Sequence, residues 1–329
     1  MKAILVNDDR SLRWDNVPDP VCGPEDCMVK IEAAALNRAD LMQREGDYPP
    51  PPGCPEWMGL EIAGTVTQVG EEAAKKSCWK VGDKVCALLG GGGYAQYANV
   101  KYDMLMPVPE NCTVIEAAAM PEAFATAYLN LFVEGGAKAG DTLLITGGNS
   151  GLASVTIPMA KAFGLRVITT VRGAAKAEAI RGLGADVIVD TTRESLADAL
   201  KAQLEQGQGV DIAIDCLGGE EMGKCLHYLN RGARWIMIAA LGGQLTQIDL
   251  KNIYVRNVRV IGSTLRSRTP EVKAQLLASL VEKVWPMVES GAVKPTVCQV
   301  LPITQAEAAQ DILYQGRNVG KVVLTVQPV

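Results

Sequence analysis

One short segment constrains the fold of this chain more than any other: the glycine-rich run Thr146–Ala153, which reads Thr-Gly-Gly-Asn-Ser-Gly-Leu-Ala. It separates an apolar run of strand type, Thr142–Ile145, from a segment of helical type that continues to Phe163. Glycines let a backbone approach a pyrophosphate closely, and the N-terminus of the helix favours its negative charge. Strand, turn and helix in this order predict a Rossmann-type dinucleotide-binding unit in a doubly wound parallel sheet, with a bend in the helix at Pro158.

The rest of the chain shows two kinds of pattern. Between residues 121 and 269, apolar runs alternate with helix-like segments, which is typical of a parallel sheet covered on both faces. Before residue 121 the runs are short and separated by Gly and Pro, which indicates a small barrel-like β domain. At about 150 residues per domain, the 329 residues predict two domains. We assign residues 1–120 and 270–329 to the first and residues 121–269 to the second.

The apolar runs define the elements that we expect. The predicted strands are Met28–Ile31, Ile62–Val66, Lys84–Leu88, Tyr94–Ala98, Thr142–Ile145, Arg166–Thr170, Val187–Val189, Asp211–Asp215, Arg234–Ile238 and Lys321–Thr325. Helices are predicted up to Phe163, up to Leu183 and from Val272 to Val288.

Composition and charge exclude several classes of function. A net charge of -5 and a pI near 5.2 argue against a nucleic-acid partner, which needs clustered positive charge. No apolar run approaches the roughly 20 residues that cross a bilayer, and acids follow the first few apolar residues, so we expect a cytoplasmic protein without a membrane segment. The nine cysteines are scattered without a Cys-x-x-Cys pair, which favours reduced, structurally idle thiols.

The residues after the second strand of the nucleotide unit indicate which cofactor is bound. An Asp or Glu there would bind a ribose 2′-hydroxyl and repel a 2′-phosphate. This chain instead has Val-Arg-Gly-Ala-Ala-Lys over Val171–Lys176, so Arg172 and Lys176 can both face a phosphate. The pattern favours NADPH over NADH, with two solvated surface cations as the alternative interpretation.

Two early segments resemble the zinc-binding segments of medium-chain alcohol dehydrogenases without their metal ligands. Asn37–Asp40 stands where those enzymes have a cysteine, and Gly59–Glu61 replaces their Gly-His-Glu. The four closely spaced cysteines of their structural zinc lobe are missing, and we expect His227, the one histidine, to be structural, so no metal site is predicted.

The chain is similar over essentially its whole length to the zinc-free quinone oxidoreductases of the medium-chain dehydrogenase/reductase superfamily, and most similar to the tumour-suppressor-inducible quinone oxidoreductases. The segments that carry this resemblance are Asn37–Arg44, Tyr48–Gly53, Trp79–Asp83, Gly91–Tyr97, Ala117–Ala123 and Leu265–Arg268. It implies a GroES-like β domain, to which the C-terminal segment returns, and a Rossmann domain. It also implies a homodimer or homotetramer, often joined through a sheet edge that would here be Val258–Gly262.

The resemblance also implies which residues form the site. Asn37, Asp40 and Tyr48 would lie near the reacting ring as catalytic residues. The implied cofactor-binding residues are Thr126 near the nicotinamide, Gly148, Ser150, Gly151 and Leu152 at the pyrophosphate, Arg172, Gly173 and Lys176 at the 2′-phosphate, Ala240, Leu241 and Gly242 at the carboxamide, and Leu265, Arg266, Asn318 and Lys321. Arg172 and Gly173 depart from the family, where Gly and Ser are frequent.

We therefore expect an NADPH-dependent quinone oxidoreductase that moves hydride from nicotinamide C4 to a quinone in an interdomain cleft, using hydrogen bonds in place of a metal. Tyr48 is the candidate donor to the developing oxyanion, with an aromatic pocket wall as the alternative, and Asn37 could equally be a turn residue. Two other functions stay open: reduction of the double bond of enones or alkenals, and NADPH binding with little turnover. The physiological substrate and the choice between one- and two-electron reduction also stay open.

Overall fold

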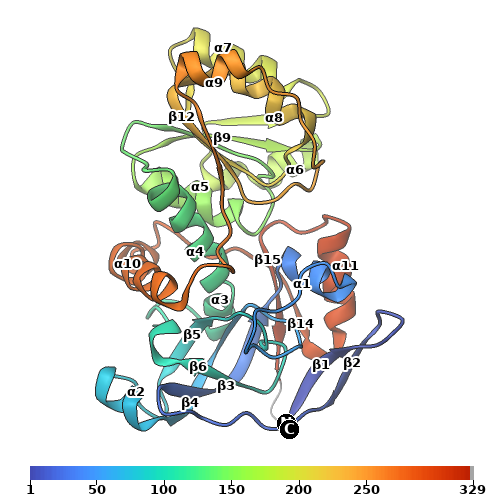
Figure 1. Cartoon of the computed structure of the whole chain (residues 1–329), viewed down its shortest axis with the longest axis vertical. Coiled ribbons are helices and arrows are strands. Elements are labelled where there is room, and N and C mark those ends of the chain that lie inside the picture. Colours follow the sequence, from blue (N-terminus) through green and yellow to red (C-terminus); the bar gives the residue numbers. More distant parts are fainter. Residues whose placement is uncertain (327–329) are drawn as a thin grey trace. The chain divides into compact units, whose positions relative to one another are not determined.

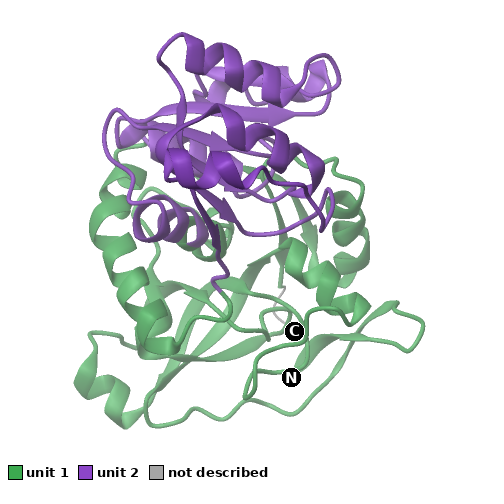
Figure 2. Cartoon of the chain, turned by 45° about the horizontal axis from the view of Figure 1, so that its top comes forward, with its two compact units in different colours: residues 1–125, 266–291, 295–329 green, residues 126–265, 292–294 purple. Residues whose placement is uncertain are grey.

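The chain forms two compact units, which Figure 2 shows in different colours. The computed structural model describes residues 1–326. Unit 1 comprises residues 1–125, 266–291 and the segment from residue 295 onward, whereas unit 2 comprises residues 126–265 and 292–294. The sequence placed the boundaries near residues 120 and 270, and it did not single out the short stretch 292–294.

Unit 2 is built on a parallel sheet of six strands. They are β8 (Thr142–Ile145), β9 (Arg166–Val171), β10 (Val187–Asp190), β11 (Val210–Asp215), β12 (Leu229–Met237) and β13 (Arg259–Gly262). Their order is β10-β9-β8-β11-β12-β13, and every neighbouring pair is parallel. The apolar run of β8 is buried throughout, as a central strand requires. The order reverses between β8 and β11, so the predicted doubly wound Rossmann sheet is confirmed.

Helices cover both faces of this sheet (Figure 1). They are α5 (Ala153–Ala162), α6 (Ala174–Ala179), α7 (Leu196–Glu205), α8 (Gly219–Cys225) and α9 (Leu250–Arg256), with the short turns η3 (Arg181–Leu183) and η4 (Leu226–Tyr228). In Figure 1, α5 and α6 lie on one side of the strands and α7, α8 and α9 on the other. The side with α7 and α8 packs a core that includes Leu144, Ile168, Leu200 and Trp235.

The helices after β8 and β9 compare differently with the prediction. Helix α5 ends at Ala162 with Phe163 as its cap, close to the predicted end, and it contains Pro158, where the expected bend stays a prediction. The helix predicted up to Leu183 ends as α6 at Ala179, and a 3-10 turn ended by Gly184 (φ 91°) follows. Gly182 and Gly184 explain the early end, because glycine is a poor helix former.

Unit 1 contains a larger, mostly antiparallel sheet and a separate hairpin. The strands of the unit are β1 (Lys2–Val6), β2 (Leu12–Asn16), β3 (Asp26–Ala35), β4 (Glu61–Val69), β5 (Lys84–Leu88), β6 (Tyr97–Lys101), β7 (Leu105–Pro107), β14 (Val297–Pro302) and β15 (Lys321–Thr325). The order is β14-β15-β3-β4-β5-β7, with β6 paired to β3 and with β1 and β2 as a separate hairpin. The late strand β15 lies between β14 and the early strand β3.

The strand predicted at Tyr94–Ala98 begins only at Tyr97. Tyr94 lies in an irregular segment. The Tyr94 amide donates to Met58 O (2.9 Å), and the Tyr94 carbonyl accepts from the Ile4 amide (2.8 Å). Its ring is fully buried. Local alternation did not reveal this, because both partners of Tyr94 come from distant parts of the chain.

Unit 1 also contains helices, several of which contact strands of its sheet. They are α1 (Arg38–Glu45), α2 (Glu71–Lys76), α3 (Val114–Ala118), the start of α4 (Pro121–Tyr128), α10 (Pro270–Glu289) and α11 (Ala306–Tyr314), with the 3-10 turns η1 (Tyr102–Met104) and η5 (Ile303–Gln305). Helix α4 crosses into unit 2, where it passes into a π-helical stretch, η2 (Leu129–Glu134). The predicted helix near residues 272–288 is α10, which Thr269 caps and Pro270 opens.

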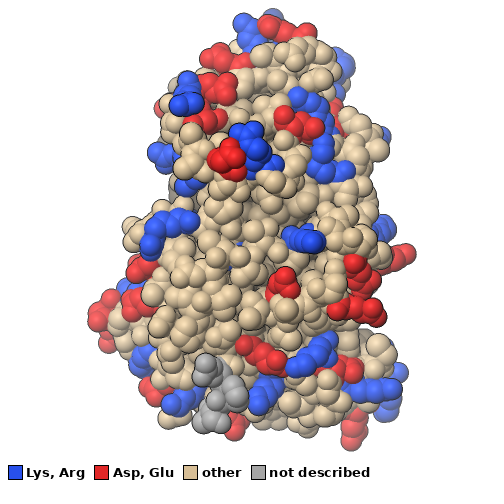
Figure 3. All heavy atoms as spheres, turned by 180° about the vertical axis from the view of Figure 1, so that it is seen from behind, with Lys and Arg blue, Asp and Glu red and all other residues tan. Residues whose placement is uncertain are grey.

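Two properties of the whole chain bear on its partners. Among residues 1–326, the structure has no helix that combines the length and the apolar character of a membrane span. On the face seen in Figure 3, Lys and Arg side chains are interspersed with Asp and Glu side chains.

Candidate active site

The glycine-rich turn after β8 is fixed by the end of the neighbouring strand β9. The amides of Gly147 and Gly148 donate to Thr170 Oγ1 (3.1 Å) and Thr170 O (2.7 Å) at the end of β9. Gly147 has φ 71°, in the region that favours glycine. A Cβ on Gly148 would lie 2.6 Å from Thr169 Oγ1, so no larger residue fits there without a shift. The chain thus enters α5 along one defined path, with Ser150 Oγ accepting from the amide of Ala153 (3.1 Å).

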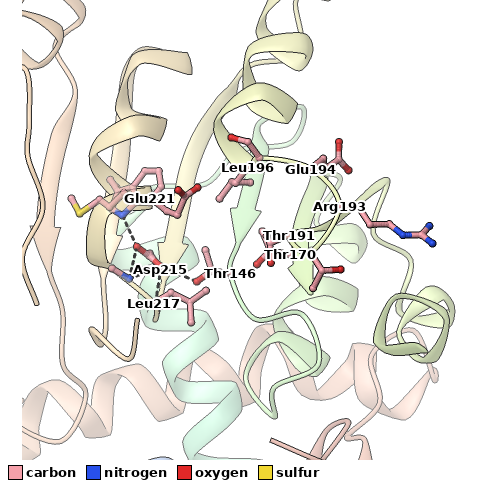
Figure 4. Close-up of a pocket in the computed structure, with 14 residues that line it drawn as sticks. Thr146, Thr170, Thr191, Arg193, Glu194, Leu196, Asp215, Leu217 and Glu221 are labelled. Atoms are coloured by element: carbon pink, nitrogen blue, oxygen red, sulfur yellow. Dashed lines mark hydrogen bonds between the residues drawn. The ribbon is translucent and has the colours of Figure 1, made fainter. Parts of the chain in front are cut away.

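A cavity of about 520 Å³ opens at the carboxyl ends of the parallel strands of unit 2 (Figure 4). Thr146 and Thr170 contribute from the ends of β8 and β9, and the segment Thr191–Leu196 contributes from the loop between β10 and α7. The remaining wall comes from Asp215, Leu217, Gly218, Glu221, Met222 and Trp235. Ligands of doubly wound sheets bind at this edge, where the strand order reverses.

Asp215 links three strands by hydrogen bonds at the base of this cavity. Its carboxylate accepts hydrogen bonds from Thr146 Oγ1 (2.8 Å), the Leu217 amide (2.8 Å) and Trp235 Nε1 (3.1 Å). Figure 4 shows Asp215 and Thr146 side by side, with Glu221 reaching from α8. These bonds join β8, β11 and β12 at the point where β11 ends. The segment with Ala240, Leu241 and Gly242 lies nearby, because the Leu241 and Gly242 amides donate to Cys216 O (3.1 Å) and Leu217 O (2.7 Å).

The turn after β9 carries the predicted 2′-phosphate residues. Arg172 is exposed, Lys176 is half-buried, and Gly173 has φ 103°. The Gly173 amide donates to Asp190 Oδ1 (2.8 Å), a carboxylate that also accepts from the Thr192 hydroxyl (2.7 Å). These bonds lower the pKa of Asp190, and the bond from the Thr192 hydroxyl has the largest effect.

Sequence reasoning missed this acid. Asp190 does not follow β9 along the chain; it ends β10, and the sheet pairs it with Val171 of β9. The other oxygen of Asp190, Oδ2, is buried and accepts no hydrogen bond among the described residues. The strand-like run ending in Asp190 was the available signal, since parallel strands end at the same edge. The residues predicted to bind the 2′-phosphate, two of which are cations, therefore have a carboxylate as their neighbour.

In unit 1, Asn37 and Asp40 form the capping box of α1. The Asn37 amide donates to Asp40 Oδ2 (2.7 Å), and the Tyr94 hydroxyl and the Gly59 amide also donate to this carboxylate (2.9 and 3.2 Å). Asp40 is fully buried, and burial raises its pKa to about 6 in spite of these bonds. These three donors all belong to unit 1, which makes Asp40 part of the framework that holds Asn37.

A buried ion pair lies beside Asn37. Lys321 Nζ is 2.5 Å from Glu61 Oε1, and it also donates to Asn37 Oδ1 (2.7 Å) and Leu36 O (2.7 Å). Asn37 Nδ2 donates to Glu61 Oε1 (3.0 Å), and the Glu122 amide donates to Glu61 Oε2 (2.9 Å). All three donors of Lys321 are thus engaged within unit 1, so a direct bond from Lys321 to a cofactor would have to replace one of these three.

Tyr48 and Arg266 are in direct contact. The Arg266 guanidinium carbon lies 4.5 Å from the centre of the Tyr48 ring, and the same group donates to Tyr48 O (3.2 Å), Gly90 O (2.8 Å) and Gln43 Oε1 (3.0 Å). Burial raises the pKa of Tyr48, and the charge of Arg266 opposes this. Lys273 closes the group by donating to Arg266 O (2.7 Å). A neutral phenol on a rigid support can donate a hydrogen bond.

The structure thus groups the predicted residues into distinct sets. Asn37, Asp40 and Lys321 share one buried network, Tyr48 and Arg266 form a contact pair, and Gly148 to Leu152 form the turn. Leu265 is buried, the carbonyl of Thr126 accepts from Asn130 Nδ2 (2.8 Å), and Asn318 donates to Gly320 O (2.8 Å). Among residues 1–326, no three His, Cys, Asp or Glu side chains gather in a group that could hold a metal ion.

Comparison with known proteins agrees with this architecture. Residues 23–110 match the family model of the alcohol dehydrogenase GroES-like domain, and residues 151–282 match that of the zinc-binding dehydrogenases. A quinone oxidoreductase of Mus musculus is 29% identical over 93% of this chain and 90% of its own length.

Solved structures show the same fold. A mycobacterial protein in complex with NADPH superposes with a TM-score of 0.84 at 28% identity, covering 99% of this chain and 100% of its own. An NAD-dependent alcohol dehydrogenase has a TM-score of 0.83 at 28% identity, with coverage of 99% and 100%. With its GroES-like unit, its Rossmann unit and these relatives, the chain belongs to the medium-chain dehydrogenase/reductase superfamily of oxidoreductases.

Proposed function

We propose that this protein is an NADPH-dependent quinone oxidoreductase that works without a metal. The observation that carries the proposal is the combination of a dinucleotide turn in unit 2 with a buried polar site in unit 1 at which, among residues 1–326, no three metal-ligating side chains come together. The name of the Mus musculus relative and the NADPH bound to the mycobacterial one support the choice of substrate and cofactor.

The residues of unit 2 fit a dinucleotide. Gly148 leaves a space against Thr169 that any side chain would fill, and the cavity at the strand ends is large enough for part of the cofactor. We assign the pyrophosphate to the turn at Gly148–Leu152, the adenosine half to the cavity, and the 2′-phosphate to Arg172 and Lys176. When bound, the reduced nicotinamide supplies a hydride.

The residues of unit 1 orient and polarise the acceptor. Arg266 fixes the Tyr48 ring from one side, so the hydroxyl of Tyr48 is held ready to donate to an oxygen that gains charge. Donors of this kind contribute about 2.7–4 kcal/mol to the transition state. Asn37, held by Glu61 and Lys321, is a second polar group on the same unit.

The test is oxidation of NADPH with an ortho-quinone, a para-quinone and a simple enone, repeated with NADH. Wild type is compared with a double variant, Arg172→Ala with Lys176→Ala, and with Lys201→Ala as a matched control on the exposed surface of α7. We expect quinone turnover with a preference for NADPH, lost in the double variant and kept in the control.

Other outcomes select the other functions. Turnover of the enone alone would make the protein a double-bond reductase. Binding of NADPH, seen as a change in its fluorescence, without consumption by any acceptor would make it a cofactor-binding protein. An unchanged cofactor preference in the double variant would contradict the assignment of Arg172 and Lys176.

We also propose that the protein is a cytoplasmic homodimer joined through β13. This strand ends the sheet of unit 2, so one row of its backbone groups is unpaired within the sheet. Its Val260 is 45% exposed, and the adjoining α9 exposes Leu250, Tyr254 and Val255. Light scattering should give twice the monomer mass, and Val260→Lys should shift the mass towards the monomer.

A further inference from the structure

We propose that a second cavity, in unit 1, binds a small organic anion with an apolar body, of the class of medium-chain monocarboxylates. Its volume is about 570 Å³, within the range of about 300–1,000 Å³ that is typical of small-molecule sites. The described residues that line it are all different from those proposed to bind the cofactor or the acceptor. The inference therefore goes beyond the proposed function and does not depend on it.

The cavity lies where β3 changes its neighbour along one edge (Figure 1). The first half of β3 pairs with β6, and its last residues pair with β15. Between these two ladders the Ile31 amide donates to Gln96 O (2.9 Å), and the Val326 amide donates to Glu32 O (2.9 Å). Gln96 directly precedes β6, and Val326 directly follows β15. The cavity thus opens between two strand ends that hydrogen bonds hold in place, and the mouths of barrel-like sheets are common ligand sites.

The buried part of the lining is apolar. It consists of Met28 and Ile31 of β3 together with Val326. Pro20, which is half-buried, also lines the cavity. An apolar group of a ligand is favoured against such a surface, because its binding removes apolar area from water.

The more accessible part of the lining carries hydrogen-bond donors. Lys30 of β3 and Tyr97 of β6 are direct partners in the sheet, so their side chains are neighbours on one face. Gln68 contributes from β4, and Gln96 is oriented by its amide oxygen, which accepts from the Lys2 amide (2.7 Å). Among residues 1–326, the side-chain N–H and O–H groups of these four lining residues donate to no protein acceptor. All four donors are therefore available to a ligand.

The charges around the cavity favour an anion. Within the described part of the chain, the ammonium group of Lys30 forms no ion pair. The next acid along β3, Glu32, is paired with Lys84 at 2.6 Å. Asp19, the acid among the described lining residues, forms an ion pair with the amine of Met1. Lys30 is thus left to form a charge-assisted hydrogen bond with a carboxylate.

This division of the lining selects the class of ligand. An apolar floor takes an aliphatic or small aromatic body, and one cation with neutral donors at the opening takes one carboxylate. An uncharged apolar molecule would leave Lys30 without a partner. A polyphosphate would bring several negative charges to a lining in which Lys30 is the cation without a counter-ion.

The experiment follows the binding of octanoate, and of its neutral counterpart octanamide, to the full chain by NMR of methionine methyl groups labelled with ¹³C. Met1 and Met28 line the cavity, whereas the other nine of the eleven methionines are not among its described lining residues. We expect octanoate to shift the Met1 and Met28 signals with a Kd of about 1 mM or below. Octanamide should bind at least about tenfold more weakly, because it lacks the charge.

Two variants separate the role of Lys30 from a general effect of charge. Lys30→Gln should weaken octanoate binding by about tenfold or more and make octanoate and octanamide bind alike. The matched control is Lys101→Gln, which makes the same change of charge at the end of β6. Lys101 pairs with Glu25 at 3.7 Å, and both side chains are exposed. This control should bind octanoate within about twofold of wild type, because solvent and salt screen such charges.

Several results would overturn the inference. They are equal affinities for octanoate and octanamide in wild type, an octanoate affinity that survives Lys30→Gln, and shifts confined to methionines other than Met1 and Met28. Residues 327–329 follow Val326 along the chain and are an alternative occupant, so a chain that ends at Val326 is measured as well. Equal affinity of the two chains for octanoate supports the proposal. Binding seen only in the shortened chain would assign the cavity to residues 327–329 instead. Failure of wild type to oxidise NADPH with any acceptor would refute the proposed function and leave these results as they are.

Discussion

Replacing Lys321 by Met should destabilise unit 1 far more than a surface substitution of the same kind. The side chain of Lys321 is only 4% exposed, and that of its partner Glu61 is fully buried. Lys321→Met leaves the Glu61 carboxylate with hydrogen bonds from Asn37 Nδ2 and the Glu122 amide but without a counter-ion. Breaking a buried pair in this way costs about 3–5 kcal/mol, because the remaining charge cannot be hydrated.

The matched control is Lys84→Met. Lys84 pairs with Glu32 at 2.6 Å in the same unit, but the two side chains are 50% and 37% exposed. Such pairs contribute about 0–1 kcal/mol. The two substitutions remove the same group at nearly the same distance from a carboxylate, so the difference between their effects reports burial of the pair together with the loss of the buried bonds from Lys321 to Asn37 Oδ1 and Leu36 O.

Urea unfolding followed by tryptophan fluorescence is a suitable assay. Four of the five tryptophans belong to unit 1, and Trp235 alone belongs to unit 2. The double variant Lys321→Met with Glu61→Gln should recover about 0.5–3 kcal/mol relative to the sum of the single effects. Equal costs for Lys321→Met and Lys84→Met, or additive single effects at the buried pair, would refute the reasoning. A large loss of NADPH affinity at unchanged stability would instead support the predicted cofactor role of Lys321.

Three further predictions concern the turn, the acid at the start of α4 and metal removal. Gly148→Ala places a Cβ 2.6 Å from Thr169 Oγ1, so a fluorescence titration should show NADPH binding weakened by at least about tenfold, whereas Gly182→Ala, with open space around it, should bind normally. Glu122→Gln should change how stability depends on pH. In wild type, burial raises the pKa of Glu122 from 4.5 to about 7, so the folded protein binds this proton more tightly than the unfolded chain does. Wild type is therefore most stable while Glu122 is protonated, and this contribution is lost as pH rises through about 7. The variant should therefore gain up to about 3 kcal/mol on wild type at pH above 7 and little near pH 4, and a difference independent of pH would contradict this. Dialysis against EDTA should leave turnover unchanged, because the described residues hold no cluster of three metal ligands, and activity restored only by zinc would show the opposite.

The features that the sequence predicts well are local and periodic. The strand Thr142–Ile145 has the predicted bounds, because a short apolar run bounded by glycines leaves a central strand few alternatives. The turn that follows is equally local, since its chemistry depends on adjacent residues. From these features the order of strands and helices in unit 2 follows.

What the sequence does not reveal depends on contacts between distant residues. Arg266 approaches Tyr48 across 218 positions of the chain, and Lys321 approaches Asn37 across 284. The family resemblance implies roles for these residues but says nothing of their partners. It could therefore not show that Lys321 forms a buried ion pair with Glu61. Asp190 was overlooked because its place beside Gly173 follows from the pairing of two strands. Side-chain environments of this kind need the assembled sheet.

The position of β15 in the sheet also fixes an order of events during synthesis. Glu61 leaves the ribosome 260 residues before Lys321, a delay of roughly 10–50 s at about 5–20 residues per second. Through this interval the sheet of unit 1 lacks the strand that lies between β3 and β14, and the carboxylate of Glu61 has no counter-ion. Unit 2, built almost wholly from one continuous stretch, is free of this constraint. A nascent chain can therefore fold unit 2 before it can complete the sheet of unit 1. Ribosome-bound chains that stop short of β15 should bind a dinucleotide, whereas their unit 1 should remain sensitive to protease.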